Sequence, residues 1–255
     1  MSLNRRQREI IRIASEAGAV IVDDLAAHFR VTPQTIRRDM NLLSTRNLLE
    51  RFHGGARPPS PSENTQYDIR RRTMAAQKKA IARAAANQIP NGASLFITIG
   101  TTTEAVAQCL IGHRDLRVTT NNLNVAGMLA QQTDFEVLVT AGIVRNEDNG
   151  IVGQSAIDLF DSLRVDYAII GISGINLNGE LLDFDFREVR AAQTVVRNAD
   201  KVFLVADSSK VERKAMVRMG HFRDLDMLFT DEPLPSELAT IADEERVEVK
   251  VVAIP

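Results

Sequence analysis

Hydrophobic residues near the N-terminus recur with the period of a short amphipathic helix. Ile36, Met40 and Leu43 are spaced by four and then three residues, so they form one buried stripe. Thr32 is a favourable N-cap residue, and Pro33 follows at the first helical position, where its missing N–H is not needed. The pattern therefore predicts a helix that begins at Pro33.

A second amphipathic helix is predicted just before this turn. Leu25, Ala26 and Phe29 place apolar surface on one side of it, and Asp23 and Asp24 are expected to cap its N-terminus. Two such helices joined by a tight turn have the arrangement of a helix-turn-helix, whose second helix enters the major groove of DNA.

The polar residues of the second helix are of the types that read DNA. The residues expected to contact DNA from this helix are Gln34, Thr35, Arg37, Arg38 and Asn41. Gln, Arg and Asn side chains can each form two hydrogen bonds to one base edge. The same residues also suit an ordinary solvated helix face, and the helical pattern alone leaves both interpretations open.

A short β-hairpin is predicted after this helix. Residues 48–57 alternate partly between apolar and polar, with a turn at the Gly54-Gly55 pair. A hairpin in this position is the wing of a winged helix. Arg51, His53 and Arg57 would then lie near the phosphate backbone of DNA.

From about Met74 the chain alternates short apolar runs with helical patterns. The runs that predict strands are residues 95–99, 116–120, 136–140, 166–172, 201–206, 227–230 and 249–254. The patterns that predict helices are residues 75–89, 102–111, 123–131, 155–163 and 188–198. This alternation predicts an α/β domain with a mostly parallel sheet covered on both faces, whose ligands bind beyond the carboxyl ends of the strands.

Three prolines between Arg57 and Asn64 favour an extended spacer. We therefore expect a winged helix-turn-helix domain at residues 1–57, a linker at 58–74 and an effector-binding domain at 75–255.

Charge is divided unevenly along the chain. Residues 1–72 hold 13 Arg or Lys against 8 Asp or Glu, whereas the whole chain has a net charge of −2. A basic head on an acidic body is typical of a nucleic-acid-binding module joined to another domain. No apolar run approaches the length of about 18 residues that spans a membrane. The N-terminus lacks the apolar core of a signal peptide, and Cys109 is the single cysteine, features that favour the cytoplasm.

Polar segments follow five of the predicted strands at the point where each strand ends. They are Ile-Gly-Thr-Thr-Thr at 99–103, Thr-Thr-Asn-Asn at 119–122, Ala-Gly at 141–142, Gly-Ile-Ser-Gly at 171–174 and Asp-Ser-Ser-Lys at 207–210. Each one alone is also ordinary turn chemistry. At the start of a helix, however, the Gly-Thr-Thr-Thr segment offers backbone N–H groups and hydroxyls to a phosphate, and Lys210 can add a positive charge.

Both halves of the chain resemble the DeoR family of bacterial transcriptional regulators. In the first half the resemblance rests on Val-Thr-Pro-Gln-Thr-Ile-Arg-Arg-Asp at 31–39 and Arg-x-His-Gly-Gly-Ala at 51–56. In the second half it rests on the Gly-Thr-Thr, Thr-Asn-Asn, Gly-x-x-Gly and Asp-x-Ser-Lys turns described above. It implies a winged helix followed by a sugar-phosphate-sensing domain with the fold of ribose-5-phosphate isomerase. Thr98 departs from the family pattern, which usually has an acidic residue two positions before the loop glycine.

Further segments are similar to one member of this family. They are residues 89–92, 121–126, 171–175, 181–185 with 188–190, and 215–220. The similarity implies a repressor that leaves double-stranded operator DNA when it binds a small phosphorylated effector, glycerol 3-phosphate. It also implies a homo-oligomer, either a dimer or a tetramer. The residues expected to surround the effector are Gly100, Thr101, Thr102, Thr103, Asn121, Asn122, Ser173, Asp183, Glu188 and Lys210.

A sugar-phosphate isomerase with an added DNA-binding domain is the main alternative. The isomerase fold places acidic residues at the turn occupied here by residues 171–174, and this turn has no carboxylate to act as a base. We therefore expect binding without catalysis and assign no catalytic residue. A regulator of a different sugar phosphate, or an activator, stays open. The histidines lack metal-ligand spacing and no dinucleotide fingerprint follows a strand, so no metal and no cofactor are expected.

Overall fold

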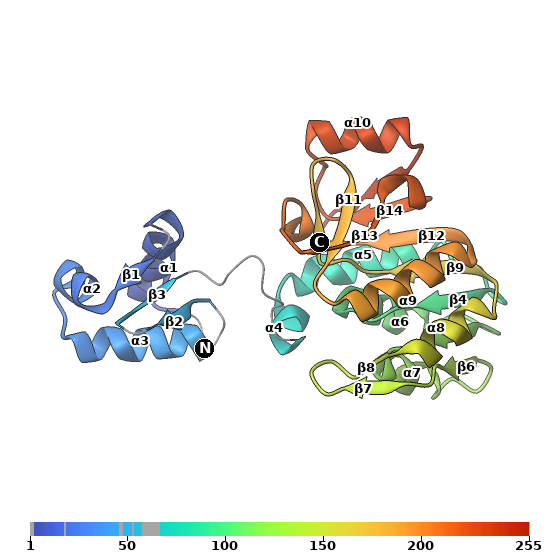
Figure 1. Ribbon diagram of the computed structural model, residues 1–255, viewed down its shortest axis with the longest axis horizontal. Helices are drawn as coiled ribbons and strands as arrows, with labels where there is room; N and C mark the ends of the chain where they lie inside the picture. The colour runs from blue at the N-terminus through green and yellow to red at the C-terminus, as the bar shows by residue number, and fades with distance from the viewer. Residues whose placement is uncertain (1–2, 18, 46–47, 53, 58–66, 255) are drawn as a thin grey trace. The chain divides into compact units, whose positions relative to one another are not determined.

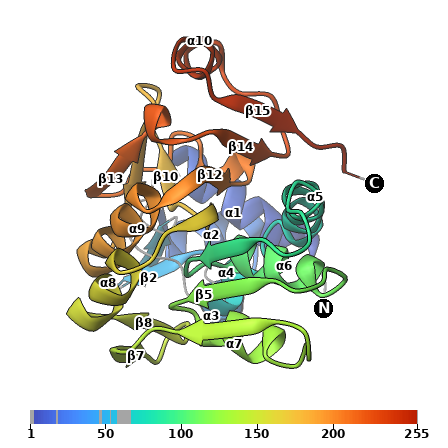
Figure 2. The same cartoon turned by 90° about the vertical axis from the view of Figure 1, so that its right-hand side faces the viewer.

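The computed structural model describes residues 3–17, 19–45, 48–52, 54–57 and 67–254. The chain divides into two compact units, Met1–Ile69 and Arg70–Pro255, which are seen in Figures 1 and 2.

The first unit is a winged helix-turn-helix. Its elements are α1 (Arg5–Ala17), β1 (Val20–Ile21), α2 (Val22–Phe29), α3 (Pro33–Thr45), β2 (Glu50–Phe52) and β3 (Gly55–Arg57). The three strands form a small antiparallel sheet in the order β1-β3-β2. The predicted stripe of Ile36, Met40 and Leu43 is completely buried, and it packs with Ile10 of α1 and Leu25 of α2. The helix pair and the hairpin expected from the sequence are thus confirmed.

The two helix starts in this unit differ from each other. α3 begins as predicted, because the backbone N–H of Thr35 donates to Oγ1 of Thr32 at 3.3 Å. The predicted cap of α2 is wrong: Ile21 is its N-cap and makes no side-chain capping bond. Asp23 and Asp24 lie in the first turn of α2, where carboxylates still interact favourably with the helix dipole.

The second unit is built on a seven-stranded sheet in the order β15-β14-β12-β9-β4-β5-β6. The strands are β4 (Ser94–Ile97), β5 (Arg117–Thr120), β6 (Glu136–Val139), β9 (Val165–Ile170), β12 (Ala199–Val205), β14 (Met227–Thr230) and β15 (Glu248–Val251). Every neighbouring pair in this sheet is parallel. All seven predicted strands are therefore present, in the mostly parallel arrangement that their alternation with helices predicted.

Helices cover both faces of this sheet, as Figure 2 shows. They are α5 (Ala75–Ala86), α6 (Thr101–Leu110), α7 (Leu123–Leu129), α8 (Gln154–Asp161), α9 (Phe186–Arg197) and α10 (Ser236–Glu244), and the short α4 (Tyr67–Arg72) precedes them. Successive strand residues point to opposite faces. Ile169 joins the apolar cluster of α5, α6 and α7, whereas Ala168 and Ile170 join that of α8 and α9.

Several small elements were not expected from the sequence. β7 (Ile143–Arg145) and β8 (Gly150–Val152) form a separate hairpin. β10 (Gly174–Ile175), β11 (Glu180–Asp183) and β13 (Val217–His221) form a small antiparallel sheet. The 3₁₀ turns η1 (Ser208–Lys210) and η2 (Phe222–Asp224), together with α10, complete this unit. None of the described helices is both long enough and apolar enough to cross a bilayer.

Candidate functional site

The outward face of α3 carries the polar residues predicted to contact DNA. Gln34, Arg37, Arg38 and Asn41 are all exposed, while Thr35 is half-buried and its hydroxyl lies 2.9 Å from that of Thr32. This separation of an exposed polar face from a buried stripe is the property that lets a recognition helix enter the major groove without disturbing its own core.

Residues of the wing and of α1 support this helix. An Arg51 guanidinium N–H on β2 donates to the side-chain oxygen of Asn41, which links wing and recognition helix. Asp39 is buried on the inner side of α3 and accepts hydrogen bonds from Nε of Arg6 at 2.6 Å and from Nε2 of Gln7 at 2.8 Å. The predicted contact residue His53 lies outside the described residues.

The second unit has a pocket at the carboxyl ends of its central strands. The strand order reverses between β4 and β9, because β5 and β6 follow on one side of β4 and β9, β12, β14 and β15 on the other. Ligands of parallel sheets bind at such a switch point. The polar residues that line the pocket are Arg70, Gly100, Thr101, Thr102, Ser173, Asp183, Glu188 and Lys210. An adjoining hollow adds Thr98 and Asn121.

The loop after β4 forms one wall of this pocket. Gly100 is the N-cap of α6, and its φ of +153° is one that an L side chain rarely adopts. The buried hydroxyl of Thr103 donates within the loop, where the carbonyl oxygens of Thr98 and Gly100 both lie 2.8 Å away. The first N–H groups of α6, from Thr101 onward, are left at the pocket, as required for anion binding at a helix N-terminus.

Positively charged side chains gather around the same loop. Nζ of Lys78, on α5, donates to Oγ1 of Thr101 at 3.0 Å and also to the backbone carbonyl of Arg70. Burial lowers the pKa of Lys78, although Asp207 opposes the shift. Burial likewise lowers the pKa of Lys210 to about 8. Lys210 was predicted to lie here, whereas Lys78 and Arg70 were missed. Lys78 belongs to a helical pattern that gave no sign of facing a sheet edge, and Arg70 falls in the segment that was expected to be a linker.

Carboxylates occupy the opposite wall. Asp183, on β11, accepts from the hydroxyl of Ser173 at 2.9 Å and from the backbone N–H of Phe184 at 2.7 Å. Burial raises its pKa. Burial, and then the charge of Asp183, raises the pKa of Glu188 to about 7. This wall can therefore accept hydrogen bonds from hydroxyl groups and can also hold a proton near neutral pH.

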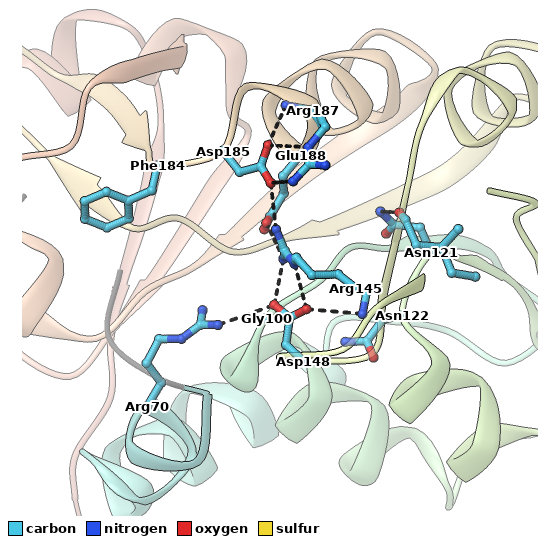
Figure 3. A network of polar contacts seen from close by, with 12 residues as sticks. Arg70, Gly100, Asn121, Asn122, Arg145, Asp148, Phe184, Asp185, Arg187 and Glu188 are labelled. Atoms are coloured by element: carbon cyan, nitrogen blue, oxygen red, sulfur yellow. Dashed lines mark hydrogen bonds and ion pairs between the residues drawn. The ribbon is translucent and has the colours of Figure 1, made fainter. Parts of the chain in front are cut away.

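Arg145 connects this acidic wall to the β7–β8 hairpin, as Figure 3 shows. Its guanidinium donates to Asp148 at 2.8 and 2.6 Å, to Glu188 at 2.7 Å and to Asp185 at 3.1 Å. Asp148 is buried, and its carboxylate also accepts a hydrogen bond from Nη2 of Arg70 at 3.4 Å. Sequence reasoning missed both Arg145 and Asp148, since a short polar loop between two runs of three residues carries no distinctive spacing.

Two of the predicted effector residues, Asn122 and Thr103, do not line the pocket or the adjoining hollow. Asn122 caps α7, accepting from the N–H of Asn124 at 2.9 Å, and its amide donates to Glu104 at 3.1 Å. Thr103 closes the loop described above. Asn121 is different: its amide donates to the carbonyl of Ile151 at 3.1 Å, while its Oδ1 is buried without a donor among the described residues.

The two units together define a class of protein. One unit presents an exposed Arg-, Gln- and Asn-bearing helix of the kind that reads DNA, and the other holds a pocket with an anion-binding loop facing carboxylates. The turn from Gly171 to Gly174 supplies no carboxylate to this pocket. No group of three or more His, Cys, Asp or Glu in the described part of the chain is arranged to hold a metal ion. These features describe a DNA-binding regulator that responds to a small molecule.

Comparison with known proteins identifies the family. A model described as the DeoR-like helix-turn-helix domain matches residues 6–62, and one described as the DeoR C terminal sensor domain matches residues 73–232. The glycerol-3-phosphate regulon repressor of Escherichia coli strain K12 is 43% identical over 251 residues, which cover 98% of this chain and 100% of that protein. The repressor of the same name from Haemophilus influenzae is 41% identical over 249 residues, 98% of this chain and 97% of that protein. The chain belongs to the DeoR family.

A partial likeness to solved structures is also found. Ribose 5 phosphate isomerase A from Neisseria gonorrhoeae is 16% identical, with a TM-score of 0.40, and the match covers 54% of this chain and 53% of that one. The full-length relatives are named as transcriptional repressors. This chain is accordingly a DNA-binding transcriptional repressor with a sensor domain for a small-molecule effector, and not an enzyme.

Proposed function

We propose that this chain represses genes of glycerol 3-phosphate metabolism and that glycerol 3-phosphate releases it from its operator. The observation that carries the proposal is a single pocket that joins an anion-binding helix N-terminus to a pair of hydrogen-bond-accepting carboxylates. Glycerol 3-phosphate has the matching polarity, with a phosphate at one end and two hydroxyl groups at the other. The names of the relatives at 41–43% identity support the same effector.

The phosphate is proposed to bind at the N-terminus of α6. There the backbone N–H groups from Thr101 onward and the positive end of the helix dipole favour a dianion. Lys78 and Lys210 contribute positive charge, and both pKa values are lowered by burial, which a phosphate would reverse. The hydroxyl groups are proposed to contact Asp183 and Glu188 on the opposite wall.

The first unit is proposed to read double-stranded operator DNA. Gln34, Arg37 and Arg38 would contact base edges in the major groove, with Thr35, Asn41, Arg51 and His53 beside them. Winged helices bind paired half-sites as symmetric assemblies, so we propose a homodimer or homotetramer that acts on cytoplasmic DNA. The functional division proposed is a DNA-binding domain at 1–57, a linker at 58–74 and an effector domain at 75–255.

Calorimetry on the full chain tests the effector. We expect glycerol 3-phosphate to bind. Glycerol and inorganic phosphate should bind much more weakly, because each of them can contact only one of the two walls of the pocket. A tighter response to another sugar phosphate would replace glycerol 3-phosphate as the effector while keeping the site.

A charge placed in the loop tests the location of the phosphate. Thr101→Asp puts a carboxylate where the phosphate is proposed to bind, so this variant should bind operator normally and lose its response to the effector. Thr133→Asp adds the same charge at an exposed turn position and should respond like the wild type. Normal induction of Thr101→Asp would refute the proposed phosphate position.

A further inference from the structure

Arg70 stands at an unusual place in the chain. It is the first residue of the second unit and lies on the short helix α4, within which the boundary between the two units falls. Yet its side chain lines the effector pocket. A ligand in the pocket can therefore contact the first residue of the second unit directly.

The guanidinium of Arg70 is only weakly bound within the protein. Nη2 reaches Oδ2 of Asp148 at only 3.4 Å, a long distance for a charged hydrogen bond. Asp148 is already bound by Arg145 at 2.8 and 2.6 Å and by the N–H of Gly150 at 3.2 Å. Nε of Arg70 is buried and meets no acceptor among the described residues. An additional acceptor in the pocket would therefore compete well with Asp148 for this guanidinium.

The backbone of Arg70 is held by the same pocket. Lys78 donates from one Nζ to the carbonyl oxygen of Arg70 and to Oγ1 of Thr101. Thr101 begins the loop at which the phosphate is proposed to bind. A phosphate there would attract Lys78 and weaken its hydrogen bond to the carbonyl oxygen of Arg70. The guanidinium and the backbone carbonyl of Arg70 would therefore both respond to phosphate binding.

We propose that Arg70 is the residue through which effector binding acts on the DNA-binding half of the chain. The inference rests on the proposed function of the pocket. The effector phosphate binds the guanidinium of Arg70, which then leaves Asp148. The phosphate also binds the amine of Lys78, which then leaves the carbonyl oxygen of Arg70. α4 is thereby seated differently, and this change is passed along the chain to the DNA-binding unit. Arg70 thus supplies the difference in affinity between two states that any ligand-driven switch requires.

Arg70→Gln tests this role with Arg71→Gln as its control. Arg71 is the next residue of α4, is exposed, and loses the same charge. For each protein the operator Kd is measured by fluorescence anisotropy without effector and with glycerol 3-phosphate at a saturating concentration, which calorimetry on the same sample establishes. The ratio of these two Kd values is the coupling, and it does not depend on how tightly either ligand binds alone.

We expect saturating effector to raise the operator Kd of the wild type and of Arg71→Gln about 5- to 150-fold. In Arg70→Gln the same ratio should fall below about threefold, although operator binding without effector shows that the protein is folded. Wild-type coupling in Arg70→Gln at saturation would overturn the inference. Where Arg70→Gln cannot be saturated, Arg70→Lys keeps a charge for the phosphate but lacks the guanidinium, and retained coupling in that variant would likewise overturn it. A wild type that binds no glycerol 3-phosphate would instead refute the proposed function.

Discussion

Removal of Arg145 is expected to be among the most damaging single changes in the second unit. Its guanidinium makes four hydrogen bonds to three carboxylates at 2.6–3.1 Å, and only 13% of its side chain is exposed. In Arg145→Met the apolar stem is kept and the charge is lost. The side chain of Asp148, which is 2% exposed, then retains only the 3.4 Å contact with Arg70 as an ion pair.

The loss of stability in Arg145→Met depends on whether the carboxylates left without a partner can be protonated. Breaking a buried ion pair by removing one partner costs about 3–5 kcal/mol, because a charge is left buried without compensation. Most of this cost should come from Asp148. Glu188 contributes less, since burial already raises its pKa to about 7 and it can take up a proton. At about 2–4 °C per kcal/mol for a domain of this size, Tm should fall by roughly 6–20 °C.

Thermal and urea unfolding followed by circular dichroism measure this cost, and Arg164→Met is the matched control. Arg164 pairs with Asp200 at 3.0 Å, but the two side chains are 69% and 66% exposed, so its loss should cost less than about 1 kcal/mol. The cost of Arg145→Met should also shrink between pH 7 and pH 5. Arg145 lowers the pKa of Glu188, so in the folded variant this pKa is higher, and protonation then relieves the variant more than the wild type. A cost equal to that of Arg164→Met, or one independent of pH, would refute the reasoning.

Three further predictions concern effector binding, DNA binding and the core of the winged helix. Because burial lowers the pKa of Lys210 to about 8, its amine is neutral at higher pH and must gain a proton before it pairs with a phosphate dianion. Calorimetry should therefore show effector affinity falling above pH 8, by up to about tenfold per pH unit, and a flat profile to pH 9 would contradict this role. Arg38→Ala should weaken operator binding by about 1–3 kcal/mol and relax base preference, whereas Arg12→Ala on α1 should not relax it; equal base preference in the two variants would argue against α3 as the reading helix. Met40→Ala should destabilise the first unit by about 2–5 kcal/mol because Met40 is fully buried, and Leu42→Ala, with Leu42 36% exposed, should cost far less; similar losses would mean that the stripe is not the core.

The periodic parts of the chain could be predicted from the sequence because their physical cause is local. The spacing of Ile36, Met40 and Leu43 and the cap at Thr32 define a helix whatever surrounds it, and α3 begins at the predicted residue. The central parallel strands were predicted for a similar reason, since strands buried on both faces must be continuous apolar runs. The cap of α2 failed because Val22 already has the helical conformation, which moves the two aspartates into the first turn.

The sequence predicted only those parts of the candidate site whose position is determined by the course of the backbone. Turns that follow parallel strands must meet at one sheet edge, so the Gly100–Thr102 loop and Lys210 could be placed together from the sequence. The side chain of Asn122 is used to cap α7 instead, which a turn motif cannot reveal because its amide can face either the pocket or the helix.

The tertiary structure alone decided which charges surround that edge. Lys78 and Arg70 come from helices before the sheet, and Arg145 and Asp148 come from a hairpin whose strands are too short for their pattern to predict it. Their partners are up to 78 residues away in sequence. Local periodicity determines the helices and strands of this protein, whereas the pairing of its buried charges depends on distances that exist only once the chain has folded.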